Sequence, residues 1–443
     1  MATPTPPTPA PSLRPADHVQ AQGGRGRRLW MLGVLSLLMG FAAISTDVYL
    51  PAMPAMAKAL HVGADMMAWT VSTFLIGFSL GQLFWGPLSD RLGRRLPVAL
   101  GLMVFMVGSA GCALAGSAIM LIAARMVQAL GAAAGVVLSR AMVRDLYAGH
   151  RGAAMLSTLI TVMAAAPLLG PLVGAQVLAH WGWRAIFWAL VGIGAATLAA
   201  LVTLPETHAT QHRETAPLTT LMARYGQLAT NPALMAWVVS CAFYYAGLFA
   251  YVAGSPFAYI SFYHVAPENY GWLFGAGVVA MMVANTLNTR LLPRWGHGAV
   301  LKVGAGLAAL SGLALVVQTA TGLGGLAGLV AGNLAYQFCS GLVIANAIAG
   351  ALEGHPRAAG AVSALSGAFQ YGSGMVGTAL LGWFANGTPQ PMAWLMGLGG
   401  VGCLACALLV KAQRHPGSGH GSGTLEQAAA LATVEAEAGL PEM

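Results

Sequence analysis

The sequence predicts an all-α integral membrane protein with twelve transmembrane helices arranged as two pseudo-symmetric halves of six. The chain has 443 residues, of which 57% are hydrophobic, and its mean hydropathy is +0.70. A water-soluble core cannot bury that much apolar surface, so lipid is the expected solvent. Apolar stretches of roughly 20 residues, the length that crosses a bilayer, recur along the chain. Charged residues make up only 8% of the sequence and gather mainly between those stretches.

The apolar stretches fall into two sets, separated by a polar segment from Pro205 to Asn231. We expect the first six helices near 30–51, 67–86, 97–119, 121–144, 154–178 and 184–204, and the second six near 233–255, 270–291, 299–320, 324–349, 359–384 and 390–411. The predicted organisation is therefore a disordered cytoplasmic tail (1–28), an N-terminal half (29–205), a cytoplasmic central loop (206–232), a C-terminal half (233–411) and a cytoplasmic tail (412–443).

The net charge of +8 reflects membrane topology and does not indicate a nucleic-acid partner. All but three of the 21 Lys and Arg residues are assigned to one side of the predicted bilayer. The exceptions are Lys58 and Arg184 in outer loops and Arg125 within a span. Positive charge is enriched on the cytoplasmic side of membrane proteins, so both termini are expected in the cytoplasm. The expected partners are the lipid bilayer, protons and a small-molecule substrate, and the chain is expected to be a monomer.

Several function classes are disfavoured by what the spans contain. The five cysteines lie in apolar stretches without metal-ligand spacing to histidine, so neither a metal nor a cofactor is expected. Every histidine falls in a loop or tail, and Asp47 is the one acid expected well inside a span, which argues against a membrane enzyme. Neither tail is long enough for the output domain of a sensor. The phosphate-binding loop of ATPases is also missing from the sequence.

Polar residues within the first helix point to a functional face. Gly33, Ser36, Gly40, Ala43 and Asp47 follow one another at spacings of three and four, which places them on one side of a helix. Tight packing through small residues is the alternative explanation for such a stripe. Packing does not account for a buried acid, because each unpaired polar group in lipid costs several kcal/mol.

Asp47 and Arg125 are expected at a similar depth near the outer face. Asp47 lies about 25 Å along the first helix from Trp30, and Arg125 lies about 6 Å into a helix that starts from the outer side. Opposite charges at one level can offset each other's desolvation cost. We therefore predict that both residues couple proton movement to transport. The alternatives are that Asp47 sits at the interface as a helix-end residue and that Arg125 extends to the outer surface.

The ten residues from Gly86 to Arg95, with the sequence GPLSDRLGRR, hold one acid and three arginines between two predicted helices. This segment resembles the Gly-x-x-x-Asp-Arg-x-Gly-Arg-Arg signature of the major facilitator superfamily. Residues 125–131, 170–174, 46–54 and 359–365 extend the resemblance to drug:proton antiporters, and to the Bcr/CflA group of bacterial multidrug efflux transporters within them. Ala129 and Ala175 stand where the family motifs usually have glycine.

The resemblance implies a conformational latch and an antiporter motif. Asp90 would face the N-terminus of the eleventh helix, where the helix dipole favours an anion, and Arg94 would pair with Asp145 until the carrier opens inward. The alternative explanation is that these residues serve only the geometry of the turn and the orientation of the chain in the membrane. The latch would comprise Gly86, Asp90, Arg91, Gly93, Arg94, Arg95 and Asp145, and the antiporter motif Gly170, Pro171 and Gly174.

The resemblance also implies the function: proton-driven efflux of small amphipathic compounds across the bacterial inner membrane by alternating access between the halves. The proton gradient would replace a cofactor as the energy source. Proton-coupled export or import of one metabolite, such as an amino acid, is the alternative. Aromatic and amide side chains suit a permissive pocket, and the candidates for substrate binding are Tyr49, Tyr244, Tyr245, Asn333, Gln337, Phe369 and Gln370.

Overall fold

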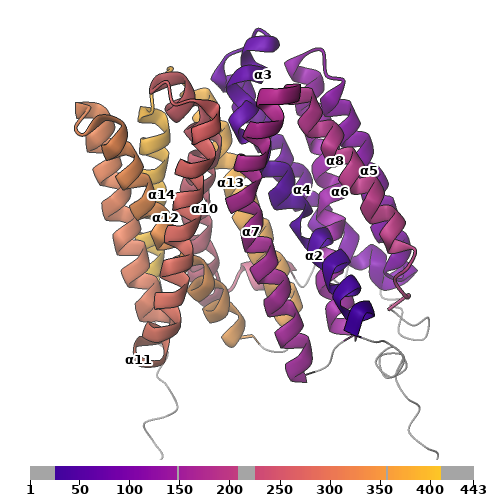
Figure 1. Cartoon of the computed structure of the whole chain (residues 1–443). Coiled ribbons are helices and arrows are strands. Elements are labelled where there is room, and N and C mark those ends of the chain that lie inside the picture. The colour runs from indigo at the N-terminus through magenta and orange to yellow at the C-terminus, as the bar shows by residue number, and fades with distance from the viewer. Residues whose placement is uncertain (1–24, 147–148, 208–224, 356–357, 411–443) are drawn as a thin grey trace, which may run out of the picture. The chain divides into compact units, whose positions relative to one another are not determined.

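The computed structural model describes residues 25–146, 149–207, 225–355 and 358–410, and the secondary structure of these residues is helical. In the N-terminal half the helices are α2 (Arg25–Asp47), the short η1 (Leu50–Ala52) and α3 (Met53–Ala59), α4 (Ala64–Leu92), α5 (Arg95–Ala113), α6 (Ala118–Leu146), α7 (Gly149–Trp181) and α8 (Trp183–Leu201). Figure 1 shows these helices running alongside one another.

The second half repeats this arrangement. It contains α10 (Pro232–Pro256), the π-helical turn η3 (Phe257–Phe262), α11 (Pro267–Thr321), α12 (Gly325–Glu353), α13 (Ala359–Trp383) and α14 (Gln390–Leu409). The continuous label α11 covers two helices, because Gly296 has φ 71° and ψ 165° and breaks the helix there. A left-handed φ of this kind is easily reached only by glycine.

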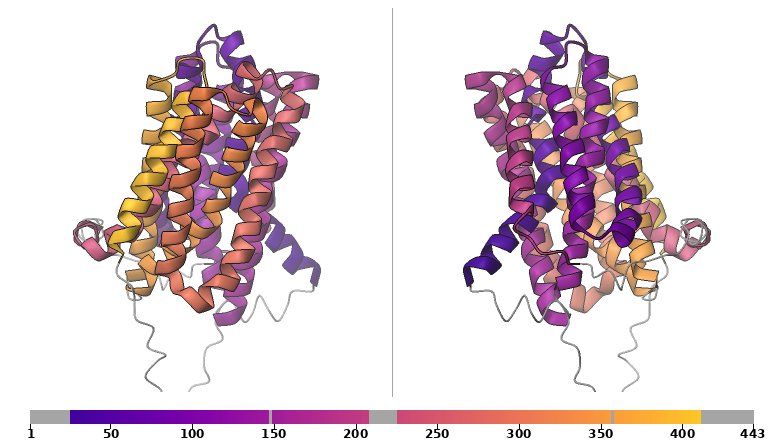
Figure 2. Two further views of the ribbon diagram at one scale, coloured as in Figure 1. Left: turned by 90° about the vertical axis from the view of Figure 1, so that its left-hand side faces the viewer. Right: turned by 90° about the vertical axis from the view of Figure 1, so that its right-hand side faces the viewer.

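Each of the twelve predicted helices thus has a counterpart in the described part of the chain. Nine of the described helices, with α11 taken as one, are long and apolar enough to cross a membrane. The main difference is at the first helix, which ends at Asp47 rather than near residue 51. Pro51 and Pro54 follow directly and cannot donate the helical hydrogen bond, so the chain continues as η1 and α3. In both views of Figure 2 the start of α2 leans away from the other helices.

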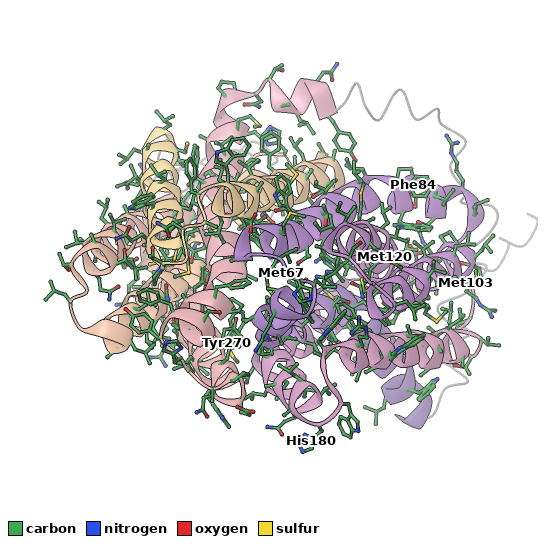
Figure 3. The ribbon with its side chains drawn as sticks, turned by 90° about the horizontal axis from the view of Figure 1, so that it is seen from above. Met67, Phe84, Met103, Met120, His180 and Tyr270 are labelled. Carbon is green, nitrogen blue, oxygen red and sulfur yellow. The ribbon has the colours of Figure 1, made fainter. Side chains whose placement is uncertain are left out.

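The two halves contact each other at the end of the bundle that carries α3, called here the α3 end. There Ser72 of α4 and Thr378 of α13 place their hydroxyl oxygens 2.7 Å apart. Viewed from this end, Met67 and Tyr270, one from each half, lie toward the middle of the bundle, while His180 lies at its rim (Figure 3). Met67 and Tyr270 are both fully buried. The α3 end is therefore closed, and the opposite end, which carries residues 86–95, is called the motif end.

Candidate functional site

The carboxylate of Asp47 is buried where α2 ends, with 6% of the residue exposed. Among the described residues no hydrogen bond or ion pair to its side chain is found. A carboxylate removed from water without a partner is costly in its charged form, because an apolar medium does not solvate the charge. The residue is therefore placed to take up a proton or a polar ligand.

The glycine motif on α7 forms one wall around Asp47. A Cβ atom added at Gly170 would lie 2.9 Å from the Cβ of Asp47, and one at Gly174 would overlap the carbonyl oxygen of Val48. The same stretch faces the second half, since a Cβ at Gly271 of α11 would come within 3.0 Å of the Leu172 backbone. Residues 170–174 thus let α7 pack tightly against both α2 and α11, and Asp47 lies at this junction.

Arg125 lies fully buried on α6, at the level of the last turn of α2. Its Nη1 donates to the carbonyl oxygen of Ser45 at 3.0 Å and to Oε1 of Gln128. The guanidinium carbon lies 4.2 Å from the ring centroids of both Tyr49 and Phe74. Each such cation–π contact contributes about 2 kcal/mol or more when it is desolvated. Aromatic rings and a backbone carbonyl therefore hold this cation in place.

Asp47 and Arg125 are close in depth but do not form an ion pair in the described structure. The Nε and Nη2 atoms of Arg125 are buried and have no hydrogen-bond partner there. The sequence did not reveal the aromatic cage, because Tyr49 and Phe74 come from different helices and their meeting depends on packing.

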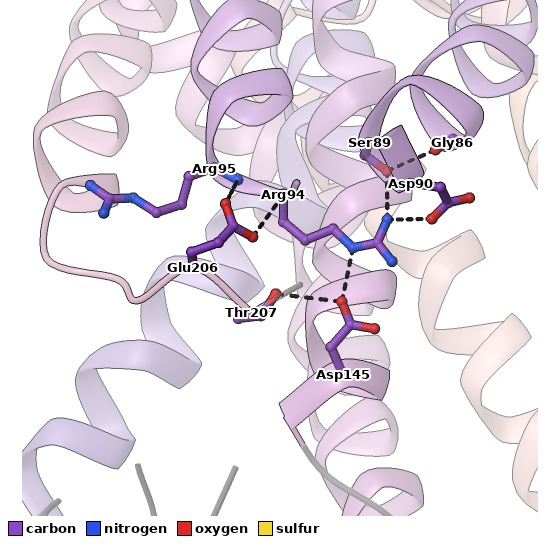
Figure 4. Close-up of polar contacts among 8 residues, drawn as sticks. All are labelled: Gly86, Ser89, Asp90, Arg94, Arg95, Asp145, Glu206 and Thr207. Atoms are coloured by element: carbon purple, nitrogen blue, oxygen red, sulfur yellow. Dashed lines mark hydrogen bonds and ion pairs between the residues drawn. The ribbon is translucent and has the colours of Figure 1, made fainter. Parts of the chain in front are cut away.

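The residues of the signature segment bring three helices together at the motif end (Figure 4). Arg94 is buried; its Nε donates to Oδ2 of Asp145 on α6 at 2.8 Å, and its Nη1 donates to Oδ1 of Asp90 on α4 at 2.6 Å. Ser89 Oγ accepts a further bond from Nη1 at 2.7 Å. Burial alone would lower the pKa of Arg94, but the hydrogen bonds to Asp145 and Asp90 outweigh burial and raise it. The arginine is thus a fixed charge that ties α4 and α6 to the start of α5.

The turn that carries this network depends on Gly93, which has φ 90° and ends α4. Arg91 and Gly86 belong to the last turns of α4, and Arg95 begins α5. None of the contacts described for Asp90 reaches α13.

Sequence reasoning missed Glu206, which completes the network. Its Oε1 accepts from the backbone N–H of Arg94 at 2.8 Å and its Oε2 from that of Arg95 at 3.1 Å. These are free N–H groups at the start of α5, where a helix favours negative charge. An acid that follows Pro205, directly after the sixth helix and on the same side as the turn, was the signal that could have revealed it.

The predicted substrate-binding residues fall into several local groups. Tyr244 stacks on Tyr336 with centroids 5.0 Å apart and donates to the Tyr336 carbonyl at 2.7 Å, so it joins α10 to α12. Asn333 donates to the hydroxyl of Tyr259 at 2.8 Å, also within the second half. Tyr49 lies beside Arg125, and Gln337 packs against Gly277. Nε2 of Gln370 on α13 lies 3.5 Å from the sulfur of Cys241 on α10, and the half-buried Tyr245 of α10 lies beside Tyr371 of α13, with ring centroids 6.1 Å apart. Phe369, which precedes Gln370, is also half-buried.

Comparison with known proteins settles the family. The model of the Major Facilitator Superfamily matches residues 35–378. The chain belongs to this superfamily of membrane transporters. The predicted family and the all-α fold with two six-helix halves are therefore confirmed.

Curated relatives match most of the chain. A bicyclomycin resistance protein homolog of Haemophilus influenzae is 32% identical over 374 residues, which is 83% of this chain and 91% of that protein. A chloramphenicol resistance protein of Pseudomonas aeruginosa is 32% identical over 390 residues, covering 83% and 86% of the two chains. Multidrug resistance protein D of Escherichia coli is 28% identical over 378 residues, covering 84% and 94%. These names agree with the predicted Bcr/CflA group.

Solved structures support the fold. The nucleoside transporter NupG superposes with a TM-score of 0.70 at 15% identity, covering 86% of this chain and 99% of that one. The Escherichia coli xylose transporter XylE, in a partially occluded inward-open conformation, gives 0.64 at 15% identity and covers 86% and 96%.

Proposed function

We propose that this chain exports small, partly apolar compounds from the bacterial cytoplasm in exchange for protons. The observation that carries the proposal is the buried Asp47 carboxylate at the junction of α2 with the glycine motif of α7. Such a group holds a proton in one state of the carrier and loses it when the junction opens to water. The drug-resistance names of the relatives support this cargo class.

Alternating access gives the two ends of the bundle their roles. The distribution of Lys and Arg supports a topology with both termini in the cytoplasm, which places the α3 end outside. The contact between the halves at the α3 end supports a state that is closed to the outside in this topology. The Arg94–Asp145 pair persists in this state. This proposal leaves the expected contact between Asp90 and α13 as the one that would form and break during the cycle.

The exchange of protons for cargo can be measured directly. The purified chain is reconstituted into vesicles that contain the pH dye pyranine and have an acidic lumen, and chloramphenicol or bicyclomycin is added outside. An antiporter moves cargo in and protons out, so the lumen becomes more alkaline. A proton symporter would respond only when the outside is the acidic side, and this outcome would favour the import alternative.

The matched variants are Asp47→Asn and Asp65→Asn. Asp65 is an exposed carboxylate at the same end of the bundle. Asp47→Asn should abolish the alkalinisation while Asp65→Asn keeps it. If Asp47→Asn transports protons at the natural rate, the coupling role of this residue is wrong.

A further inference from the structure

Two pairs of histidine and asparagine lie at the motif end of the second half, and they use the histidine ring in opposite ways. His355 follows the end of α12, just before α13 begins its run toward the α3 end. Its ring contacts Asn231, the residue that caps the start of α10. His297 begins the second helix of α11 and contacts Asn346 of α12. Both rings are half-buried.

The amide group of Asn231 is held in one orientation by the start of α10. Its Oδ1 accepts from the backbone N–H groups of Ala233 at 3.0 Å and Leu234 at 3.2 Å, which are the bonds that an N-cap residue makes. Because the oxygen is engaged with the helix, the Nδ2 group is the one that lies 3.2 Å from Nε2 of His355. Asn231 is therefore the donor in this contact.

The surroundings of His355 require a neutral ring. Its Nδ1 lies 3.3 Å from the carbonyl oxygen of Ala351, and a carbonyl only accepts, so Nδ1 carries a hydrogen. Its Nε2 accepts from Asn231, so that nitrogen carries a lone pair and no hydrogen. A proton on Nε2 would set two N–H groups against each other. Rotation of the Asn231 amide would relieve this clash only by giving up the cap of α10.

The pair of His297 and Asn346 works the other way round. Asn346 is fully buried, and its Nδ2 donates to Oδ1 of Asn288 at 2.7 Å and to the carbonyl oxygen of Leu342 at 2.8 Å. Both of its N–H groups are thus used, so its Oδ1 accepts from Nδ1 of His297 at 3.0 Å. A proton on Nε2 of His297 leaves this bond in place. Protonation therefore breaks the contact of His355 and preserves that of His297.

The contact between Asn231 and His355 joins the start of α10 to the end of α12. The two helices also pack closely here, since a Cβ at Gly350 of α12 would meet the ring of Trp237 on α10. Leu234, in the first turn of α10, is only 1% exposed. Access of water to Leu234 therefore reports whether α10 and α12 are held together at this end.

The ionisable groups around His355 do not replace the contact with Asn231. The first two turns of both α10 and α13 contain no ionisable side chain. The C-terminus of α12 favours a cation on the ring, and exposed charges are screened by salt. Among the described residues, the ionisable groups that the packed elements bring to this end are Glu353 of α12, Tyr225 before α10, Cys406 of α14, and Arg290, Arg294, His297 and Lys302 of α11.

We propose that the pair of Asn231 and His355 is a sensor of cytoplasmic acidity, which holds α10 to α12 while His355 is neutral and releases them when it is protonated. Histidine ordinarily gains its charge between about pH 8 and about pH 5. The pair of His297 and Asn346 keeps α11 on α12 throughout this range. The inference rests on the proposed function for the side of the membrane that the sensor faces. A carrier that brings protons into the cytoplasm changes the quantity to which this pair responds.

Cysteine labelling tests the release. Leu234→Cys is introduced into the full chain together with Cys406→Ser, because the other four natural cysteines are buried. The purified chain in detergent reacts with a water-soluble maleimide at about pH 7.5 and at about pH 5.5, on either side of the usual histidine titration. Rates are compared between variants at the same pH, so the pH dependence of thiol reactivity cancels.

His355→Gln supplies an acceptor that does not titrate, because the glutamine Oε1 can accept from Asn231 at either pH. The chain that keeps His355 should label at the same rate as His355→Gln at the higher pH and about fivefold faster at the lower pH, the effect of one hydrogen bond. His297→Gln is the matched control and should keep the full response of the chain with His355, since the other histidine contact survives protonation.

Asn231→Asp should reverse the sign of the response. One carboxylate oxygen can still cap α10, because aspartate caps helices as well as asparagine does. The other oxygen then faces Nε2 of His355, where it accepts from the protonated ring and repels the lone pair of the neutral one. Labelling of Asn231→Asp relative to His355→Gln should therefore be slower at the lower pH than at the higher one.

The inference is overturned if the ratio of rates between the chain with His355 and His355→Gln is the same at both pH values, or if Asn231→Asp responds with the natural sign. Thermal unfolding without the added cysteine is the second measurement. The melting temperature of His355→Gln should rise relative to the natural chain as pH falls, and a constant difference would also refute the sensor. Asp47→Asn should lose proton exchange yet keep the labelling response, so failure of the export function is distinguishable from failure of the sensor.

Discussion

Ser72 and Thr378 join the two halves of the carrier through hydroxyl oxygens 2.7 Å apart at the α3 end. One of the two hydroxyls donates to the other, and the second donates to a carbonyl of its own helix, where Ser72 Oγ lies 3.2 Å from the oxygen of Ala68 and Thr378 Oγ1 lies 3.1 Å from that of Gly374. When the bond between the halves breaks, Ser72 can still donate to the carbonyl of Ala68, so its buried hydroxyl keeps a partner. The contact between Ser72 and Thr378 therefore stabilises the closed α3 end by about the free energy of a single hydrogen bond.

Thr378→Val should therefore open the α3 end more often, because valine has the same shape but no hydroxyl. The loss is about 1 kcal/mol, which corresponds to a shift of about fivefold between the two states. A cysteine at the fully buried Met67 reports the shift through faster reaction with a water-soluble maleimide. Thr73→Val is the control, since the contacts of Thr73 stay within the first half. Equal labelling rates in Thr378→Val and Thr73→Val would contradict the prediction.

The fold could be predicted from sequence because a membrane helix is defined by its own length and apolarity. The end of the first helix was misplaced by four residues, although Pro51 and Pro54 gave a local signal. The cage around Arg125 could not be predicted, since Tyr49 and Phe74 meet only after three helices pack. The site thus emerges from contacts between helices, which the sequence pattern does not encode.

Gly174→Ala should disrupt the junction around Asp47. The new methyl group would overlap the carbonyl oxygen of Val48, and backbone atoms cannot rotate away as a side chain can. Overpacking of this kind costs about 1–3 kcal/mol. We expect a lower melting temperature in detergent and loss of proton exchange in vesicles. Gly192→Ala on α8 is the matched control, because no atom lies within 4 Å of a Cβ added there. A natural melting temperature and transport rate for Gly174→Ala would show that the close approach is unnecessary.

Asp145→Asn should destabilise the motif end of the first half. The substitution leaves the buried Arg94 charge with Asp90 as its one remaining acidic partner among the described ion pairs. Removing one member of a buried pair costs about 3–5 kcal/mol, and the partial exposure of Asp145 reduces this toward about 1–2 kcal/mol. Thermal unfolding checks the loss, with Asp65→Asn as an exposed control. An unchanged melting temperature would mean that the bonds from Arg94 to Asp90 and Ser89 are enough to stabilise the motif end.

In the natural chain, the stability that the Arg94 charge contributes should not depend on pH. Burial alone would lower the pKa of Arg94, but its hydrogen bonds to Asp145 and Asp90 hold it above the usual value. A group with a raised folded-state pKa contributes its stability below the unfolded value and loses it only as pH rises through the folded one. That window lies above any pH at which the protein is studied, so Arg94 stays charged throughout.

Arg125→Met separates a structural from a functional role for the caged arginine. The guanidinium is fully buried, has no acidic partner in the described structure, and leaves Nε and Nη2 unsatisfied. Replacing a buried charge by an apolar side chain of similar volume is often neutral or stabilising. In this case the lost cation–π contacts of about 2 kcal/mol each oppose that gain. We therefore expect a change in unfolding free energy below about 1 kcal/mol together with loss of proton exchange.

The comparison variant for this test is Arg184→Met. Arg184 also lies over an aromatic ring, with its guanidinium carbon 4.1 Å from the centroid of Trp183, but its side chain is exposed. Arg184→Met should keep both stability and proton exchange, because an exposed cation–π contact contributes only about 0.5–1 kcal/mol. If Arg125→Met instead loses as much melting temperature as Gly174→Ala, the arginine serves packing between α2, α4 and α6. If it transports at the natural rate, the charge has no part in the cycle.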